Sequence, residues 1–405
     1  SSFIAYVAGQ QTDRDHYTGI LPDDEAGRAI HINNPPYGTT ENITLQGGVQ
    51  INHLFQRFLG GKNVMTLGAE YVFDDIFDTI PAYNYEIDQQ TKNIGFFAQS
   101  DWQIVPSLTF LAGIRGDKHN LVDQVIFSPR FSLLYNLKTN TQFRLTWGTG
   151  FRAPQAFDTD MHIAFAGGGV SRITLDPLLK EERSNSYSGS INWDLPTETF
   201  IAGFTLEGFY TRLDNVFYLQ PVAADEFGDR FEKRNGQGAE VMGGTLELRA
   251  NYNRKIQLEA GITIQSSLYD QPIENISGLA PLRRFLRSPN EYGYLTLSFT
   301  PGKKFNASLS SVYTGPMQLA HFAGAPEQTV NEYITSSSFT ELNAKISYTF
   351  ALPSVDSGLE IFGGVKNITN AYQDDFDSGK NRDSNYVYGP GLPRSVYVGL
   401  KLKSF

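Results

Sequence analysis

The segment Thr141-Gln-Phe-Arg-Leu-Thr-Trp-Gly148 alternates polar and apolar side chains from its second residue onward. Successive side chains of a β-strand point to opposite faces, so this pattern predicts a strand with one apolar and one polar face. The strand should end near Pro154, which cannot donate a ladder hydrogen bond. Alternation resumes only near Glu182, about thirty residues later. A connection of this length between neighbouring strands is usually functional or disordered.

The same alternation recurs along the whole chain, in about 16 segments. Short turns such as Gly60-Gly61 and Val105-Pro106 alternate with long polar loops, and residues 74–90 are expected to form a loop of medium length. Short turns at one end and long loops at the other are typical of outer-membrane barrels. The pattern therefore predicts an all-β protein, a transmembrane antiparallel β-barrel with about 16 strands in this chain.

Composition supports this fold class and excludes several others. The chain has 405 residues, of which 13% are aromatic and 19% charged, but no apolar run approaches the length of a membrane-spanning helix. A net charge of -10 without a basic cluster argues against a nucleic-acid partner. Cysteine is absent, and the 6 histidines show no metal-ligand spacing, so we expect no metal centre and no cofactor.

The two faces of the barrel wall can be assigned from the last strand. Lysines turned toward lipid would cost roughly 2–4 kcal/mol each near the middle of a bilayer, so the valine and leucine positions must face lipid. The residues expected to face lipid are Val396, Val398, Leu400 and Leu402. The residues expected to face the lumen are Tyr397, Gly399, Lys401 and Lys403, and likewise Glu341, Asn343 and Lys345.

Two short motifs flank the long central connection. The run Gly150-Phe-Arg-Ala-Pro-Gln155, followed by Leu179-Lys-Glu-Glu-Arg-Ser184, resembles paired boxes of TonB-dependent outer-membrane receptors, although Glu181 stands where that family usually has proline. Near the end, Val365-Lys-Asn-Ile-Thr-Asn-Ala-Tyr372 and Tyr388-Gly-Pro-Gly-Leu-Pro-Arg394 resemble the family's closing hairpin. The resemblance extends from about Asn93 to the end of the chain.

The resemblance implies a particular architecture. Residues 1–405 would be the C-terminal portion of a 22-stranded barrel, with the N-terminal plug domain not included. In such receptors the plug occludes the pore and couples to the TonB–ExbB–ExbD energising complex. The protein would be a multi-pass protein of the Gram-negative bacterial outer membrane. Outer-membrane lipid, lipopolysaccharide and a surface lipoprotein are then further expected partners.

The resemblance also implies a function, which is transport rather than catalysis. The extracellular loops would bind a scarce metal chelate, such as cobalamin, haem or a ferric siderophore, and the receptor would import it to the periplasm. The motif set looks most like vitamin B12, colicin-receptor and haem–siderophore members from Bacteroidetes-type bacteria. A passive 16-stranded porin is the alternative. A barrel enzyme would need a nucleophile motif, which Ser171, His162 and Asp160 do not provide.

The candidate ligand-binding residues are all in expected loops or at strand ends. Aromatic side chains give a large contact area at low entropic cost, and the alternative for each is loop packing or an interfacial girdle. These aromatics are Tyr17, Tyr83, Tyr85, Tyr386 and Tyr388.

Charged and ligating side chains complete the set of candidates. Arg283 and Arg284 could attract an anionic ligand, or contact lipopolysaccharide. Arg152 could pair with a carboxylate of the plug or simply pack at a strand end. Met161 and His162 lie where haem receptors of the family carry an axial ligand, although a lone loop histidine is more often polar surface.

Overall fold

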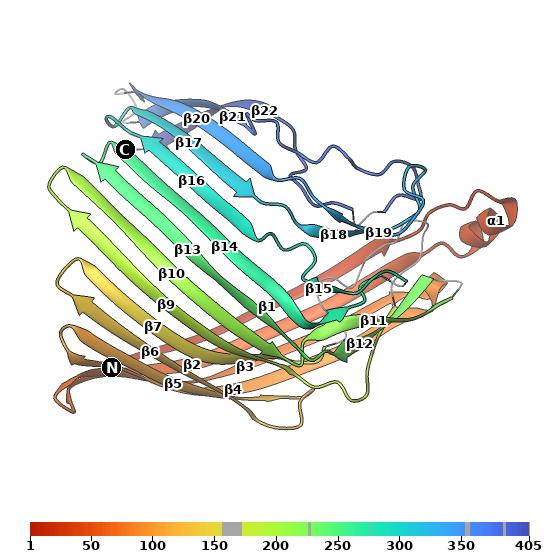
Figure 1. Ribbon diagram of the computed structural model, residues 1–405, viewed down its shortest axis with the longest axis horizontal. Coiled ribbons are helices and arrows are strands. Elements are labelled where there is room, and N and C mark those ends of the chain that lie inside the picture. Colours follow the sequence, from red (N-terminus) through yellow and green to blue (C-terminus); the bar gives the residue numbers. More distant parts are fainter. Residues whose placement is uncertain (156–171, 226–227, 277, 353–356, 384–385, 405) are drawn as a thin grey trace.

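The computed structural model (Figure 1) describes residues 1–155, 172–225, 228–276, 278–352, 357–383 and 386–404. Its main element is a 17-stranded sheet in which neighbouring strands run antiparallel and strands consecutive in the chain lie side by side. This confirms the predicted all-β class and the predicted number of long strands. Within the described residues, no helix is long and apolar enough to cross a bilayer.

The strands of the main sheet follow the chain from one edge to the other. They are β1 (Ser2–Tyr17), β2 (Tyr37–Phe58), β3 (Gly61–Ile80), β4 (Tyr85–Val105), β5 (Leu108–His119), β6 (Ile126–Leu137), β7 (Thr141–Arg152), β9 (Glu182–Pro196), β10 (Phe200–Asp214), β13 (Gly238–Tyr252), β14 (Ile256–Ile273), the short β15 (Leu282–Arg284), β16 (Glu291–Phe299), β17 (Phe305–Thr314), β20 (Phe339–Leu352), β21 (Ser357–Lys366) and β22 (Ser395–Ser404).

The remaining elements belong to the long connections. They are α1 (Glu25–Asn33), the 3₁₀ turn η1 (Pro81–Tyr83), a sheet of β8 (Arg172–Leu175), β11 (Phe217–Asp225) and β12 (Gly228–Asn235), and the pair β18 (Gln318–His321) and β19 (Glu332–Thr335). They gather at one end of the main sheet, on the right in Figure 1. We call this the long-loop end. The short turns, such as the one between β2 and β3, lie at the opposite end.

The expected loop at residues 74–90 is wrong, because β3 and β4 remain paired as far as Ile80 and Tyr85. The acidic side chains do not end the strand, since neighbouring side chains donate hydrogen bonds to them. Asp74 Oδ1 accepts from Asn42 Nδ2 at 2.9 Å and from Thr44 Oγ1 at 2.6 Å.

Among the described residues, no group of three or more histidine or acidic side chains is placed to hold a metal ion.

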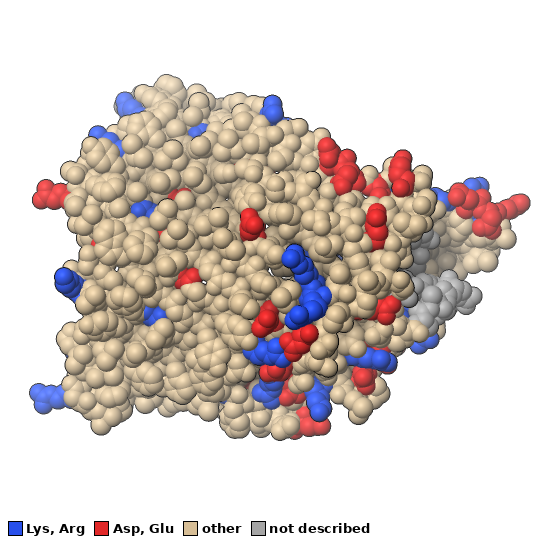
Figure 2. All heavy atoms as spheres, viewed as in Figure 1, with Lys and Arg blue, Asp and Glu red and all other residues tan. Residues whose placement is uncertain are grey.

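The predicted assignment of faces is confirmed in β22. Val396, Val398, Leu400 and Leu402 are between 68% and 78% exposed, and they form one apolar row along the strand. On the opposite face, Lys403 Nζ lies 2.8 Å from Glu360 Oε2 of β21. In the one face of the molecule that Figure 2 shows, charged side chains are sparse across most of the sheet and more numerous toward the long-loop end, with a few at the short-turn end.

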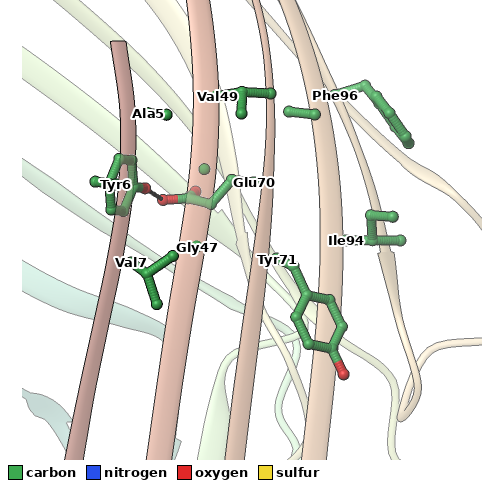
Figure 3. A pocket seen from close by; sticks show the side chains of 11 residues that line it. Ala5, Tyr6, Val7, Gly47, Val49, Glu70, Tyr71, Ile94 and Phe96 are labelled. Atoms are coloured by element: carbon green, nitrogen blue, oxygen red, sulfur yellow. Dashed lines mark hydrogen bonds between the residues drawn. The ribbon is translucent and has the colours of Figure 1, made fainter.

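The inner wall carries polar networks, and the outer wall is apolar. Glu70 of β3 accepts from the Tyr6 hydroxyl at 2.5 Å (Figure 3), from Gln46 Nε2 at 2.7 Å and from Arg115 Nη1 at 3.0 Å. On the opposite, outer face of the same strands, mainly apolar side chains line a shallow hollow of about 540 Å³ where Gly47 leaves space between its neighbours (Figure 3). Polar groups thus satisfy one another away from lipid.

The two ends of the strand order do not meet. In the described part of the chain, β1 pairs with β2 alone and β22 with β21 alone, so each has one edge without a neighbouring strand. Nearly every residue of β1 is exposed. The sheet is therefore curved but open.

Candidate ligand-binding site

The structure places every described candidate residue at the long-loop end. Tyr17 ends β1, Tyr83 lies in η1, Tyr85 begins β4, Arg152 ends β7, Arg283 and Arg284 belong to β15, and Tyr386 and Tyr388 lie between β21 and β22. Met161 and His162 lie outside the described residues, as do Asp160 and Ser171. The candidates form four local groups rather than one pocket.

The first group holds the three tyrosines of β1, η1 and β4. Tyr85 is only 4% exposed and forms a small apolar core with Ile80 and Ile87, against which Tyr83 packs. The Tyr83 hydroxyl donates to the carbonyl oxygen of Thr18 at 3.2 Å. These two tyrosines therefore hold the loops together. The burial of Tyr85 leaves little of its ring for a ligand, whereas Tyr83 is only partly buried.

Tyr17 differs from the other two tyrosines because much of its ring is exposed. Its centroid lies 5.2 Å from that of Tyr37, and its hydroxyl lies 2.5 Å from His31 Nε2 of α1. Tyr37 is also exposed. Tyr17 and Tyr37 thus present aromatic surface to solvent at the long-loop end, as a contact surface for a planar or apolar ligand requires.

The second group surrounds Arg152 and joins the two sequence boxes. β7 and β9 pair through Arg152 and Glu182, so the boxes meet as neighbouring strand ends. Arg152 Nη1 lies 3.7 Å from Glu182 Oε2, and its guanidinium lies 5.6 Å from the Phe217 ring centroid. Lys233 Nζ lies 5.2 Å from the same ring. Arg152 therefore ties the end of β7 to the starts of β9 and β11, with about half its side chain still exposed.

The third group contains the arginines near β15. Arg283 Nε donates to the carbonyl oxygen of Tyr269 at 2.9 Å, and Arg287 Nη1 donates to that of Val387 at 2.7 Å. The side chains of Arg283 and Arg284 are exposed. Nearby, Arg212 and Asp270 form a two-pronged ion pair. Exposed guanidinium groups in this position suit recognition of carboxylate or phosphate oxygens.

The fourth group, which we call the last-loop cluster, consists of His321, Gln373, Asp375, Tyr386 and Tyr388. Asp375 Oδ2 accepts from the Tyr386 hydroxyl at 2.7 Å and from the Tyr388 hydroxyl at 2.8 Å. The His321 ring stacks on Tyr386 with centroids 3.6 Å apart, and His321 Nε2 lies 3.0 Å from Asp377 Oδ1. The cluster ties the connection between β21 and β22 to β18.

The electrostatics of the last-loop cluster favour neutral tyrosines beside a charged carboxylate. Burial, reinforced by the hydrogen bond to Asp375, raises the pKa of Tyr388 to about 12 and also raises the pKa of Tyr386. Burial acts to raise the pKa of Asp375, but the hydrogen bonds from the two hydroxyls outweigh it and the pKa is lowered. At neutral pH the two tyrosines are therefore protonated and Asp375 carries its negative charge.

We expect the last-loop cluster to open in alkali. Its tyrosines keep their protons to higher pH in the folded loop than in an unfolded one, where the pKa is about 10. The stabilising effect of Tyr388 is thus complete below about pH 10 and is lost as the pH rises through about 12. Tyrosinate absorbance of the wild type minus that of Tyr388→Phe should give a midpoint near the upper value. A difference spectrum that titrates near 10 would contradict the cluster.

Sequence reasoning missed His321, Gln373 and Asp375. His321 and Asp377 are 56 positions apart, and neither belongs to a recognisable motif. Gln373 is only 1% exposed; its Nε2 donates to the carbonyl oxygen of Tyr386 at 3.0 Å, and its Oε1 accepts from the Tyr388 amide at 2.8 Å. The polar character of these residues in a loop is the only signal in the sequence.

Together, the sheet and its connections define a class of protein: an outer-membrane protein built on a large, barrel-like antiparallel sheet, with aromatic and cationic side chains at the long-loop end. A comparison with protein-family models makes this specific, because the model of the TonB dependent receptor-like β-barrel matches residues 4–368. The chain belongs to this family. The family consists of outer-membrane receptors, not enzymes. No curated protein matches the chain.

Solved structures share the fold at low sequence identity. The ferric enterobactin receptor of Pseudomonas aeruginosa (a G324V mutant) has a TM-score of 0.70 and 17% identity, covering 100% of this chain and 59% of that one. The siderophore receptor PirA of Acinetobacter baumannii has a TM-score of 0.69 and 16% identity, covering 99% and 60%. The ferric-catecholate import receptor Fiu of E. coli has a TM-score of 0.66 and 13% identity, covering 91% and 55%. The chain thus spans about 60% of the length of the first two receptors.

Proposed function

We propose that this chain is the barrel portion of a TonB-dependent receptor that binds a scarce metal chelate at the long-loop end and imports it to the periplasm. The family match over residues 4–368 is the observation that carries this proposal. Exposed aromatic and guanidinium groups at that end, including Tyr17, Arg283 and Arg284, supply the kinds of contact that such a ligand needs.

Among cobalamin, haem and ferric siderophores, we favour a ferric siderophore. The solved structures that share the fold are receptors named for enterobactin, siderophores and ferric catecholate. The metal would be cargo and not a resident cofactor. Haem ligation by Met161 and His162 remains a prediction from the sequence alone.

The proposal includes partners and strands beyond this sheet. In hydrocarbon, unpaired backbone groups cost several kcal/mol each, so the free edges of β1 and β22 need neighbouring strands. We propose that further strands complete a 22-stranded barrel, that a plug fills it, and that the TonB–ExbB–ExbD complex drives its movement. Lipid and lipopolysaccharide would surround the apolar wall, and a surface lipoprotein could cover the loops.

Uptake of radioactive iron chelates by the producing bacterium tests this function. We expect saturable uptake that is lost on deletion of the gene and on collapse of the proton gradient by a protonophore. A matched strain carrying the intact gene on a plasmid should recover uptake. Uptake that is unsaturable and insensitive to the protonophore would support the passive porin instead.

A further inference from the structure

A polar hollow of about 530 Å³ lies on the inner wall near the long-loop end. It is formed where β17, β20, β21 and β22 run side by side, at the root of the connection between β21 and β22. Its volume is within the range of small-molecule sites. The lining residues used below are Ser308, Ser310, Glu341, Asn343, Lys345, Lys366 and Tyr397.

The register of the four strands explains why the wall is hollow here. Two small serines of β17 stand opposite larger side chains of β20: Ser310 pairs with Asn343, and Ser308 pairs with Lys345. Gly364 of β21 lies between Lys345 of β20 and Tyr397 of β22. A Cβ at Gly364 would meet the Tyr397 hydroxyl at 2.6 Å, so the absence of a side chain lets the tyrosine lie across it. The result is a shallow basin with a hydroxyl-lined floor.

The two lysines at the hollow are held over aromatic rings. Lys345 Nζ lies 4.8 Å from the Phe362 ring centroid, and Lys366 Nζ lies 5.9 Å from that of Tyr397. An aromatic face attracts an ammonium group but does not accept its hydrogen bonds as an oxygen would. The N–H donors of both lysines are therefore still able to bind an anionic oxygen.

Among the described residues, neither lysine forms a salt bridge with a carboxylate, although Glu360 is close enough to attract Lys345. The Glu360 carboxylate, which is near Lys345, is held by Lys403 at 2.8 Å. Glu341 is the carboxylate that lines the hollow, so two ammonium groups face one negative charge. Elsewhere on the inner wall, Arg115 is paired with Glu70 and Asp117, and Arg249 with Asp194. The hollow is thus left with an excess of positive charge.

We call this hollow, with Lys345 and Lys366, the lysine pocket. We propose that the lysine pocket binds the anionic oxygen atoms of the transported chelate on its way from the long-loop end into the barrel. The inference rests on the proposed function and adds the ligand's charge class to it. Catecholate or carboxylate oxygens would accept hydrogen bonds from Lys345 and Lys366, and Asn343 and the serines would bind neighbouring polar groups. A pocket of this kind discriminates against an uncharged chelate of the same size.

The rim of the lysine pocket is fixed by Asn367, which is buried. Its side-chain Nδ2 donates to the carbonyl oxygens of Ala371 and Leu392 at 3.0 and 2.9 Å, and its backbone N–H donates to Asn343 Oδ1 at 2.8 Å. These bonds position one end of the connection against the strand that carries Lys345. The pocket is therefore organised before a ligand arrives.

Binding measurements on the full-length receptor in outer-membrane preparations test the lysine pocket. The probes are radioactive iron complexes of enterobactin and citrate, which are anionic, and an uncharged ferric hydroxamate. We expect the double variant Lys345→Gln/Lys366→Gln to weaken binding of an anionic complex about tenfold, and Lys345→Arg/Lys366→Arg to retain most of it. The difference in affinity between the wild type and the glutamine double variant should shrink at high salt, because salt screens the attraction between the lysines and the anionic complex.

Lys401→Gln provides the matched control, since it removes a lysine from the same wall outside the pocket. The inference is overturned if the wild type binds no anionic complex, or if the double variant binds one as tightly as the control does. It is also overturned if the double variant weakens anionic and uncharged complexes equally. If no chelate of either charge is bound or taken up, the proposed function itself fails, which distinguishes the two.

Discussion

Replacing Leu206 with arginine is expected to lower the free energy of unfolding by about 2–4 kcal/mol, the cost of a cation on the lipid face near the middle of a bilayer. Leu206 lies near the centre of β10, and its side chain is exposed on the apolar outer face. The measurement is denaturant unfolding of the purified receptor in lipid vesicles, followed by tryptophan fluorescence.

The neighbouring residue Glu207 offers a matched control. Its side chain points to the opposite face of β10, so Glu207→Arg introduces the same residue into the polar lumen. We expect this variant to lose much less stability than Leu206→Arg. Equal losses for the two variants would mean that the assignment of outer and inner faces is wrong.

Replacing Gln373 with leucine is expected to release the connection between β21 and β22. Leucine approximates the volume of glutamine but cannot bond the Tyr386 carbonyl oxygen or the Tyr388 amide, which now bond the Gln373 side chain. Each buried backbone group left without a partner costs about 1–3 kcal/mol. Amide hydrogen exchange in residues 386–392 should accelerate by on the order of tenfold or more per group.

The adjacent Asp374→Asn variant controls for a change in this part of the chain, because the Asp374 side chain is exposed. It should leave amide exchange close to that of the wild type. Strand amides in β20 should exchange equally slowly in all three proteins, since the main sheet does not depend on Gln373. Slow exchange of residues 386–392 in Gln373→Leu would show that other contacts hold the cluster.

The fold could be predicted from the sequence where one physical rule decides the outcome. A strand with lipid on one face and a polar lumen on the other must alternate, and β7 and β22 do so over most of their length. The prediction was wrong at residues 74–90, where the acidic composition suggested a loop. There, cross-strand donors such as Asn42 satisfy the carboxylates, and the strands continue.

The candidate site was less predictable, because its residues meet through register and loop packing rather than through spacing. Lys345 could be assigned to the lumen by alternation, but only the pairing of four strands places it beside Lys366 and Tyr397. Similarly, the sequence identified the loop tyrosines as candidate ligand contacts. It did not show that Tyr386 is buried under His321 while Tyr17 is exposed.

The order of the strands has a consequence for how the barrel is assembled. Every long strand of the main sheet pairs with the long strand that comes next in the chain, and tight turns close several of these pairs. Between β2 and β3, Leu59 and Gly60 have φ values of 46° and 85°, the positive pair that a two-residue hairpin turn favours. Such contacts are local and close only small loops, so each hairpin can form early. The wall can therefore grow one hairpin at a time, with the newest edge as template for the next.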